Sequence, residues 1–91
     1  MTEWRDASGR LTVHLGDDEN RFTEMVSRLK TRCCAHLIQK LDGLDQHYWD
    51  FDVKGVVIVL HWDGMMGVSI HVQEGTNEDI LRSVARKCLE E

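Results

Sequence analysis

The sequence predicts a two-layer α+β sandwich, with elements in the order β-α-β-β-β-α and two helices on one face of a four-stranded antiparallel sheet. Residues 10–15 and 48–53 alternate apolar and polar side chains, which is the period of half-buried strands. Residues 17–41 and 76–89 place apolar side chains at helical spacing instead. A chain of 91 residues with 42% hydrophobic content suits one globular domain, spanning residues 1–91.

The first predicted strand covers residues 10–15, where Leu11, Val13 and Leu15 alternate with polar side chains. Two alternatives stay open for residues 1–9. They form either a loosely ordered segment or a short edge strand through Trp4 that turns back at residues 6–9.

Residues 17–41 predict one long amphipathic helix. Asp17, Asp18 and Asn20 are all suitable N-cap residues. Its apolar stripe, which includes one histidine, consists of Phe22, Met25, Val26, Leu29, Cys33, His36 and Leu37. We expect the helix to end in a Schellman motif, with Gly43 as its C-cap glycine and the apolar Leu44 after it.

Residues 47–72 predict a three-stranded meander whose register follows from the apolar residues. A two-residue turn at residues 54–55 sets Val53 opposite Val56 and Phe51 opposite Ile58, so that all four share one face.

The second turn of the meander contains Asp63-Gly64. A two-residue turn there would place apolar side chains opposite polar ones, and a one-residue slip moves every side chain to the other face. We therefore expect a three-residue loop at residues 63–65, which sets Trp62 opposite Met66 and Leu60 opposite Val68.

The closing helix is predicted to run to about Leu89. Glu74-Gly75 ends the sheet, and Thr76 or Asn77 supplies the N-cap. Acidic side chains lie in the first turn and basic ones in the last turn, as the helix dipole favours.

The charge and the cysteines limit the classes of partner and the compartment. The net charge of −5 disfavours nucleic acid and anionic membranes, both of which are bound through Lys and Arg. No apolar run reaches the roughly 20 residues of a membrane-spanning helix, and the N-terminus shows no signal peptide. Three cysteines without a disulfide pattern fit the reducing cytoplasm.

The histidines and cysteines do not form a recognisable catalytic or metal motif. In the expected register, His61 and His71 lie about 13 Å apart, too far to share one metal ion. Cys33 and Cys88 lie on core-facing stripes, and Cys34 lies on the flank of its helix. We therefore expect no catalytic residue, no metal and no cofactor.

The sheet face away from the helices is the candidate interaction surface. It carries an apolar island flanked by acidic residues and histidines, and two methionines stand at a hairpin tip. The candidate contact residues are Tyr48, Val57, Val59, His61, Met65, Met66 and His71. Such a patch with a polar rim is typical of a partner or dimer interface, and the alternative is that a third helix or the segment around Trp4 covers it.

Residues 41–52 (LDGLDQHYWDFD) and 59–70 (VLHWDGMMGVSI) resemble a family of small uncharacterised bacterial proteins with a Tyr-Trp-Asp strand and a later Leu-His strand. The likeness covers roughly the middle third of the chain. It implies a bacterial cytoplasmic protein and brings no activity, cofactor or catalytic residue with it.

The sequence thus predicts a non-enzymatic protein-interaction module that binds a protein partner or a second copy of itself. An immunity-type inhibitor of a basic toxin is one form of this prediction. The alternative is a small ligand- or metal-binding protein, or an enzyme, that uses Tyr48, Asp50, Asp52, His61 and His71 on the outer sheet face.

Overall fold

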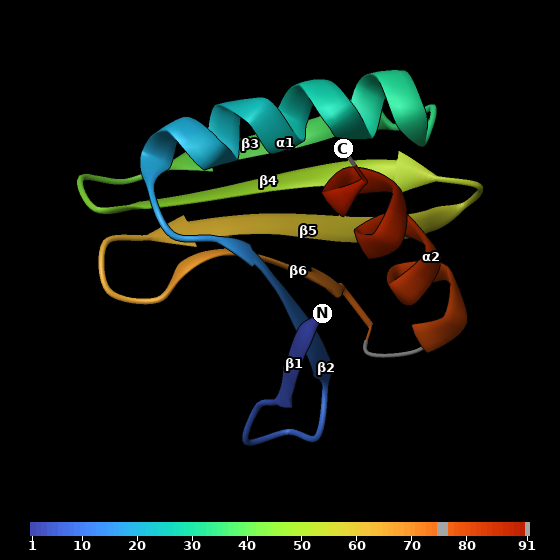
Figure 1. Cartoon of the computed structure of the whole chain (residues 1–91), viewed down its shortest axis with the longest axis horizontal. Helices are drawn as coiled ribbons and strands as arrows, with labels where there is room; N and C mark the ends of the chain where they lie inside the picture. The colour runs from blue at the N-terminus through green and yellow to red at the C-terminus, as the bar shows by residue number, and fades with distance from the viewer. Residues whose placement is uncertain (75–76, 91) are drawn as a thin grey trace.

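The computed structural model describes residues 1–74 and 77–90. Its elements are β1 (Thr2–Arg5), β2 (Leu11–Gly16), α1 (Glu19–Arg32), β3 (His36–Asp42), β4 (Gln46–Val53), β5 (Val56–Asp63), β6 (Gly67–Val72) and α2 (Glu78–Leu89). The six strands form one antiparallel sheet in the order β1-β2-β6-β5-β4-β3 (Figure 1). The α+β class is therefore confirmed, whereas the predicted four-stranded sheet is wrong.

The first additional strand is β1, the edge-strand alternative for residues 1–9. Trp4 lies opposite Thr12 of β2. The turn between the two strands is closed by the Asp6 carboxylate, which accepts hydrogen bonds from the backbone N–H groups of Ser8 and Arg10. Figure 1 shows this β1–β2 hairpin turned away from the other four strands.

The second additional strand, β3, corrects the prediction of one helix over residues 17–41. Helix α1 begins after Asp18, whose side chain accepts from the Arg21 N–H at 2.9 Å, and it ends at Arg32. Cys34 then adopts a left-handed backbone conformation, φ +53°, and the chain reverses into β3. His36 is consequently an exposed strand residue and not part of a helical core stripe.

The expected Schellman motif after residue 41 is wrong for the same reason. Residues 43–46 close the β3–β4 hairpin, where the Gly43 N–H donates to the Gln46 carbonyl oxygen at 2.7 Å. Asp-Gly is also a hairpin-turn dipeptide, so the same residues suit both structures.

The first turn of the meander has the predicted register, with Val53 opposite Val56 and Phe51 opposite Ile58. The second register is wrong by two residues, because Leu60 lies opposite Ile70. The apolar residues still share one face, since a shift of two preserves the alternation.

The position of the second turn follows from two local interactions. The Asp63 carboxylate accepts from the backbone N–H groups of Met65 and Met66, so Asp63 belongs to the last strand pair, opposite Gly67. Gly67 has φ +80°, and an added Cβ would lie 2.4 Å from the Gly16 carbonyl oxygen. No other residue fits there without a backbone shift.

The hydrophobic core lies between the helices and one face of the sheet. Helices α1 and α2 pack on each other and against β2, β5 and β6. The fully buried side chains include Val13, Met25, Leu29, Phe51, Ile58, Leu60, Val68, Ile70, Leu81 and Cys88. α2 spans Glu78–Leu89, as predicted, with Asn77 at its N-cap, while Gly75 and Thr76 lie outside the described residues.

Candidate functional site

The outer sheet face, opposite the helices, collects the predicted surface residues from β4, β5 and β6. Tyr48 lies opposite His61, and their rings stack with centroids 4.2 Å apart and planes 10° from parallel. His71 lies opposite Val59, while His61 lies opposite Ser69. The two histidines are therefore diagonal neighbours, about 7 Å apart, and not 13 Å apart as the expected register required.

The centre of this face holds neutral imidazoles. Burial lowers the pKa of His61, and burial together with the charge of Arg10 lowers the pKa of His71 to about 4. Burial also raises the pKa of Asp50. Neutral imidazoles bind hydrogen-bond donors or metals, yet within residues 1–74 and 77–90 no three His, Cys, Asp or Glu side chains are placed to hold one ion.

The predicted apolar island is less accessible than a contact surface requires. Val59 is only 6% exposed and Val57 is half-buried. Thr12 and Ser69, on the neighbouring strands, are buried as well. The larger exposed side chains lie nearer the end of the sheet.

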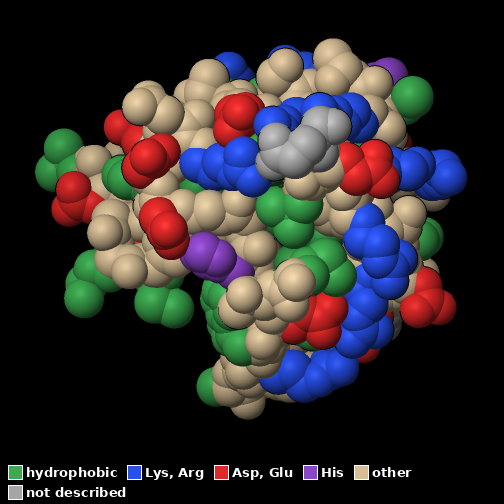
Figure 2. Space-filling view, in the orientation of Figure 1, with side chains coloured by type: hydrophobic (Ala, Val, Ile, Leu, Met, Phe, Trp, Pro, Cys, Tyr) green, Lys and Arg blue, Asp and Glu red, His purple; other side chains and the backbone are tan. Residues whose placement is uncertain are grey.

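That end carries what we call the tip surface, made of Leu41, Leu44, Tyr48, Met65 and Met66. Leu44 and Met65 are almost fully exposed, and Leu41 and Met66 are more than half exposed. The β3–β4 and β5–β6 turns lie at the same end of the sheet (Figure 1), where Figure 2 shows hydrophobic side chains at the surface.

The two turns that form the tip surface are held together. The Gly64 N–H donates to the Asp45 carbonyl oxygen at 3.2 Å. A shallow groove of about 370 Å³ runs between Leu41, Leu44 and Tyr48. Tyr48, Met65 and Met66 were predicted surface residues.

Sequence reasoning missed Leu41 and Leu44, as it missed the exposed Ile38 of the same strand. The helix prediction assigns Leu41 to a helix and makes Leu44 the apolar residue after the C-cap glycine. The Asp42-Gly43 dipeptide was the signal that could have revealed a hairpin there.

A second cluster joins α1 to the sheet on the helix side. Nε2 of His47 lies 2.8 Å from the Glu19 carboxylate, and Nδ1 lies 2.7 Å from the Asp42 carboxylate. The Trp49 indole N–H also donates to Asp42, at 2.7 Å. The hydrogen bond to Glu19 raises the pKa of His47 most, which favours a protonated ring between two carboxylates. This arrangement is that of a structural ion pair, because both ring nitrogens are occupied.

Cys33 and Cys88 are buried, as predicted. Cys34 is exposed and lies after the end of α1, so its predicted place on the flank of a helix is wrong. The thiol of Cys88 hydrogen-bonds Cys33 and lowers its pKa, while this bond and burial raise the pKa of Cys88.

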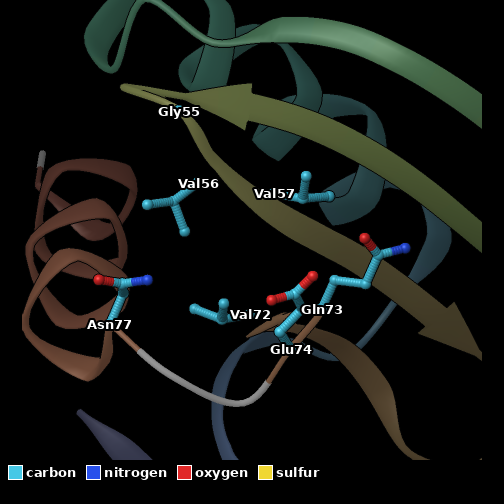
Figure 3. A pocket seen from close by; sticks show the side chains of 7 residues that line it. All are labelled: Gly55, Val56, Val57, Val72, Gln73, Glu74 and Asn77. Atoms are coloured by element: carbon cyan, nitrogen blue, oxygen red, sulfur yellow. The ribbon is translucent and has the colours of Figure 1, made fainter.

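A small pocket lies where the β4–β5 turn, the end of β6 and the start of α2 meet (Figure 3). Its lining includes Val56, Val72, Gln73 and Glu74, and its volume is about 120 Å³. Small-molecule sites usually measure roughly 300 Å³ or more, so this pocket does not match one.

Comparisons with protein-family models, with curated proteins and with solved structures find no match to this chain. The resemblance to a small bacterial family therefore stays a prediction. Among the described residues, no helix has the length and apolar character needed to cross a membrane.

Proposed function

We propose that this protein is a protein-interaction module that binds its partner through the tip surface. One observation carries the proposal: four of its five side chains are large, apolar and more than half exposed, and they lie in or beside two turns joined by a hydrogen bond. Single exposed apolar residues are ordinary on proteins, whereas a contiguous group with a polar rim is typical of a contact surface.

The chemistry of the tip surface supports the same proposal. Methionine side chains are flexible and polarisable, so Met65 and Met66 suit an adaptable contact. Tyr48 is held in place by its stack on His61, and an immobilised aromatic ring loses little entropy on binding.

Site-specific photo-cross-linking tests this proposal. A benzophenone amino acid is placed at Leu44 or at Met65, and the protein is irradiated both purified and in cell extract. The matched control carries the same group at Lys54, an exposed residue in the turn at the opposite end of the sheet. We expect adducts from positions 44 and 65 that excess unlabelled wild type suppresses and the variant Leu44→Asp/Met65→Asp does not.

Absence of adducts from positions 44 and 65 would contradict the proposal. Equal adduct formation from all three positions would contradict it too, because the cross-linking would then reflect exposure alone.

A further inference from the structure

Strand β3 is an open edge of the sheet. It packs principally on β4, and the helices pack on strands further into the sheet. Six of its seven residues are exposed, among them Ile38 at 55% and Leu41 at 61%. A long exposed edge strand with apolar side chains offers unpaired N–H and C=O groups to another strand.

The β3–β4 turn determines which backbone groups of β3 face outward. The Gly43 N–H donates to the Gln46 carbonyl oxygen, and antiparallel pairs alternate between bonded and non-bonded positions from there. Leu41 therefore directs its backbone groups toward β4. Lys40 and Asp42 direct theirs toward the open edge.

Charge distinguishes the registers that are centred on residues 40, 41 and 42 when this edge pairs with itself. In an antiparallel pair related by a two-fold axis, a centre at Lys40 sets two ammonium groups opposite each other, and a centre at Asp42 sets two carboxylates opposite each other. Like charges directly opposite are destabilising. A centre at Leu41 sets Lys40 of each copy opposite Asp42 of the other, so both outward-facing pairs combine opposite charges.

The exposed side chain of Leu41 favours the same register. With the centre at Leu41, that residue lies opposite itself in a non-hydrogen-bonded pair, where side chains approach most closely. Leu41 is 61% exposed, so this contact removes a large apolar side chain from water. The regular pairing covers Lys40 to Asp42, because the register of β3 shifts between Leu37 and Gln39 and the strand ends at Asp42.

We infer that β3 pairs antiparallel with β3 of a second copy of this chain, about a two-fold axis at Leu41, and joins the two sheets into one. This inference rests on the proposed function and names its partner. Charge complementarity and apolar complementarity agree on it independently, and an isologous contact of this kind closes at a dimer.

A charge-swap experiment tests the register. Lys40→Glu and Asp42→Lys each place like charges opposite in their own homodimer, so we expect each to weaken association roughly tenfold or more in sedimentation equilibrium. Mixing the two variants restores both opposite-charge pairs in a heterodimer. Each Asp42→Lys monomer also loses its bonds to His47 and Trp49, and mixing cannot restore those.

A disulfide experiment covers the case in which a charge variant fails to fold. In a Cys34→Ser background, Leu41→Cys places two thiols at Cα atoms about 4.5 Å apart across the two-fold axis, within disulfide range. Gln39→Cys is the matched control on the same strand, because its own copy lies about 13 Å away in this register. We expect covalent dimer from Leu41→Cys and none from Gln39→Cys.

The outcomes separate the two proposals. A wild type that stays monomeric at all concentrations, with no disulfide from Leu41→Cys, overturns the β3 pairing, and so does a mixture that fails to restore association. Cross-linking of a different protein at position 44 would still support the interaction module while overturning the second copy as its partner. Absence of every cross-linked adduct would contradict both the interaction module and the pairing of β3 with a second copy.

Discussion

Nε2 of His47 lies 2.8 Å from Oε2 of Glu19, so the first residue of α1 and strand β4 are joined by an ion pair. The Asp42 carboxylate binds the other ring nitrogen. Protonation of one imidazole thus ties together the helix layer, β4 and the edge strand β3.

Substitution of His47 therefore has a pH-dependent effect. Its folded-state pKa is raised above 6.5, so its stabilisation is complete below pH 6.5 and disappears as the pH rises through the folded-state value. We expect His47→Gln to lower the free energy of unfolding by about 1 kcal/mol in acid and by less in alkali, since the pair is partly exposed. Urea unfolding over a pH series measures this, and an equal loss at every pH would contradict it.

The contribution of His71 to stability changes with pH in the opposite direction. Its folded-state pKa is about 4, below the ordinary 6.5, so the unfolded chain takes up the proton first and stability falls as the pH drops from 6.5 toward 4. We expect His71→Gln to remove that fall, because lowering a pKa from 6.5 to about 4 corresponds to about 3 kcal/mol. Urea unfolding of wild type and variant tests this. His36→Gln, at an exposed position, is the control and should keep the wild-type slope.

The turn between β4 and β5 contains a stabilising substitution. Lys54 and Gly55 both have positive φ, +53° and +82°, which is the geometry of a type I′ turn. Asparagine adopts this conformation more readily than lysine, so Lys54→Asn should raise the free energy of unfolding by about 0.5–1 kcal/mol. Thermal and urea unfolding would measure the gain. Lys30→Asn, on the exposed side of α1, should give no gain.

Thiol accessibility distinguishes the three cysteines. Cys34 is exposed, whereas Cys33 and Cys88 are 7% and 0% exposed. A disulfide reagent should therefore modify one thiol quickly in the native protein and all three in denaturant. Cys34→Gly should abolish the fast phase and stabilise the fold by about 1 kcal/mol, because glycine adopts φ +53° without strain. A fast phase that survives this substitution would place another thiol at the surface.

The first hairpin of the meander could be predicted because the positions of its apolar residues indicate both the strands and their register. Phe51 and Ile58 follow the two-residue alternation and also lie symmetrically about the turn, so strand and register agree. The hydrophobic pattern around the second turn does not determine where that turn lies. Its position depends on the Asp63 carboxylate bonding two backbone amides and on the close approach of Gly67 to Gly16, which hydrophobic alternation does not report.

The end of α1 was not predictable from the same kind of pattern. Cys34 occupies the left-handed position where glycine or asparagine normally marks a helix end, so the boundary has no residue signal. Leu37 and Leu41 fit a helical stripe as well as a strand. This error also affected the candidate site, because it left Leu41 and Leu44 out of the predicted contact surface.

The pairing of β2 with β6 has a consequence for how the chain holds together. The sheet is completed only when residues far apart in sequence meet, and each helix covers strands from the other half of the chain. Residues 1–35 taken alone would leave the apolar side of α1 in water, and residues 36–90 would leave β5 and β6 half covered. Neither half buries its own apolar surface, so we expect neither to fold by itself.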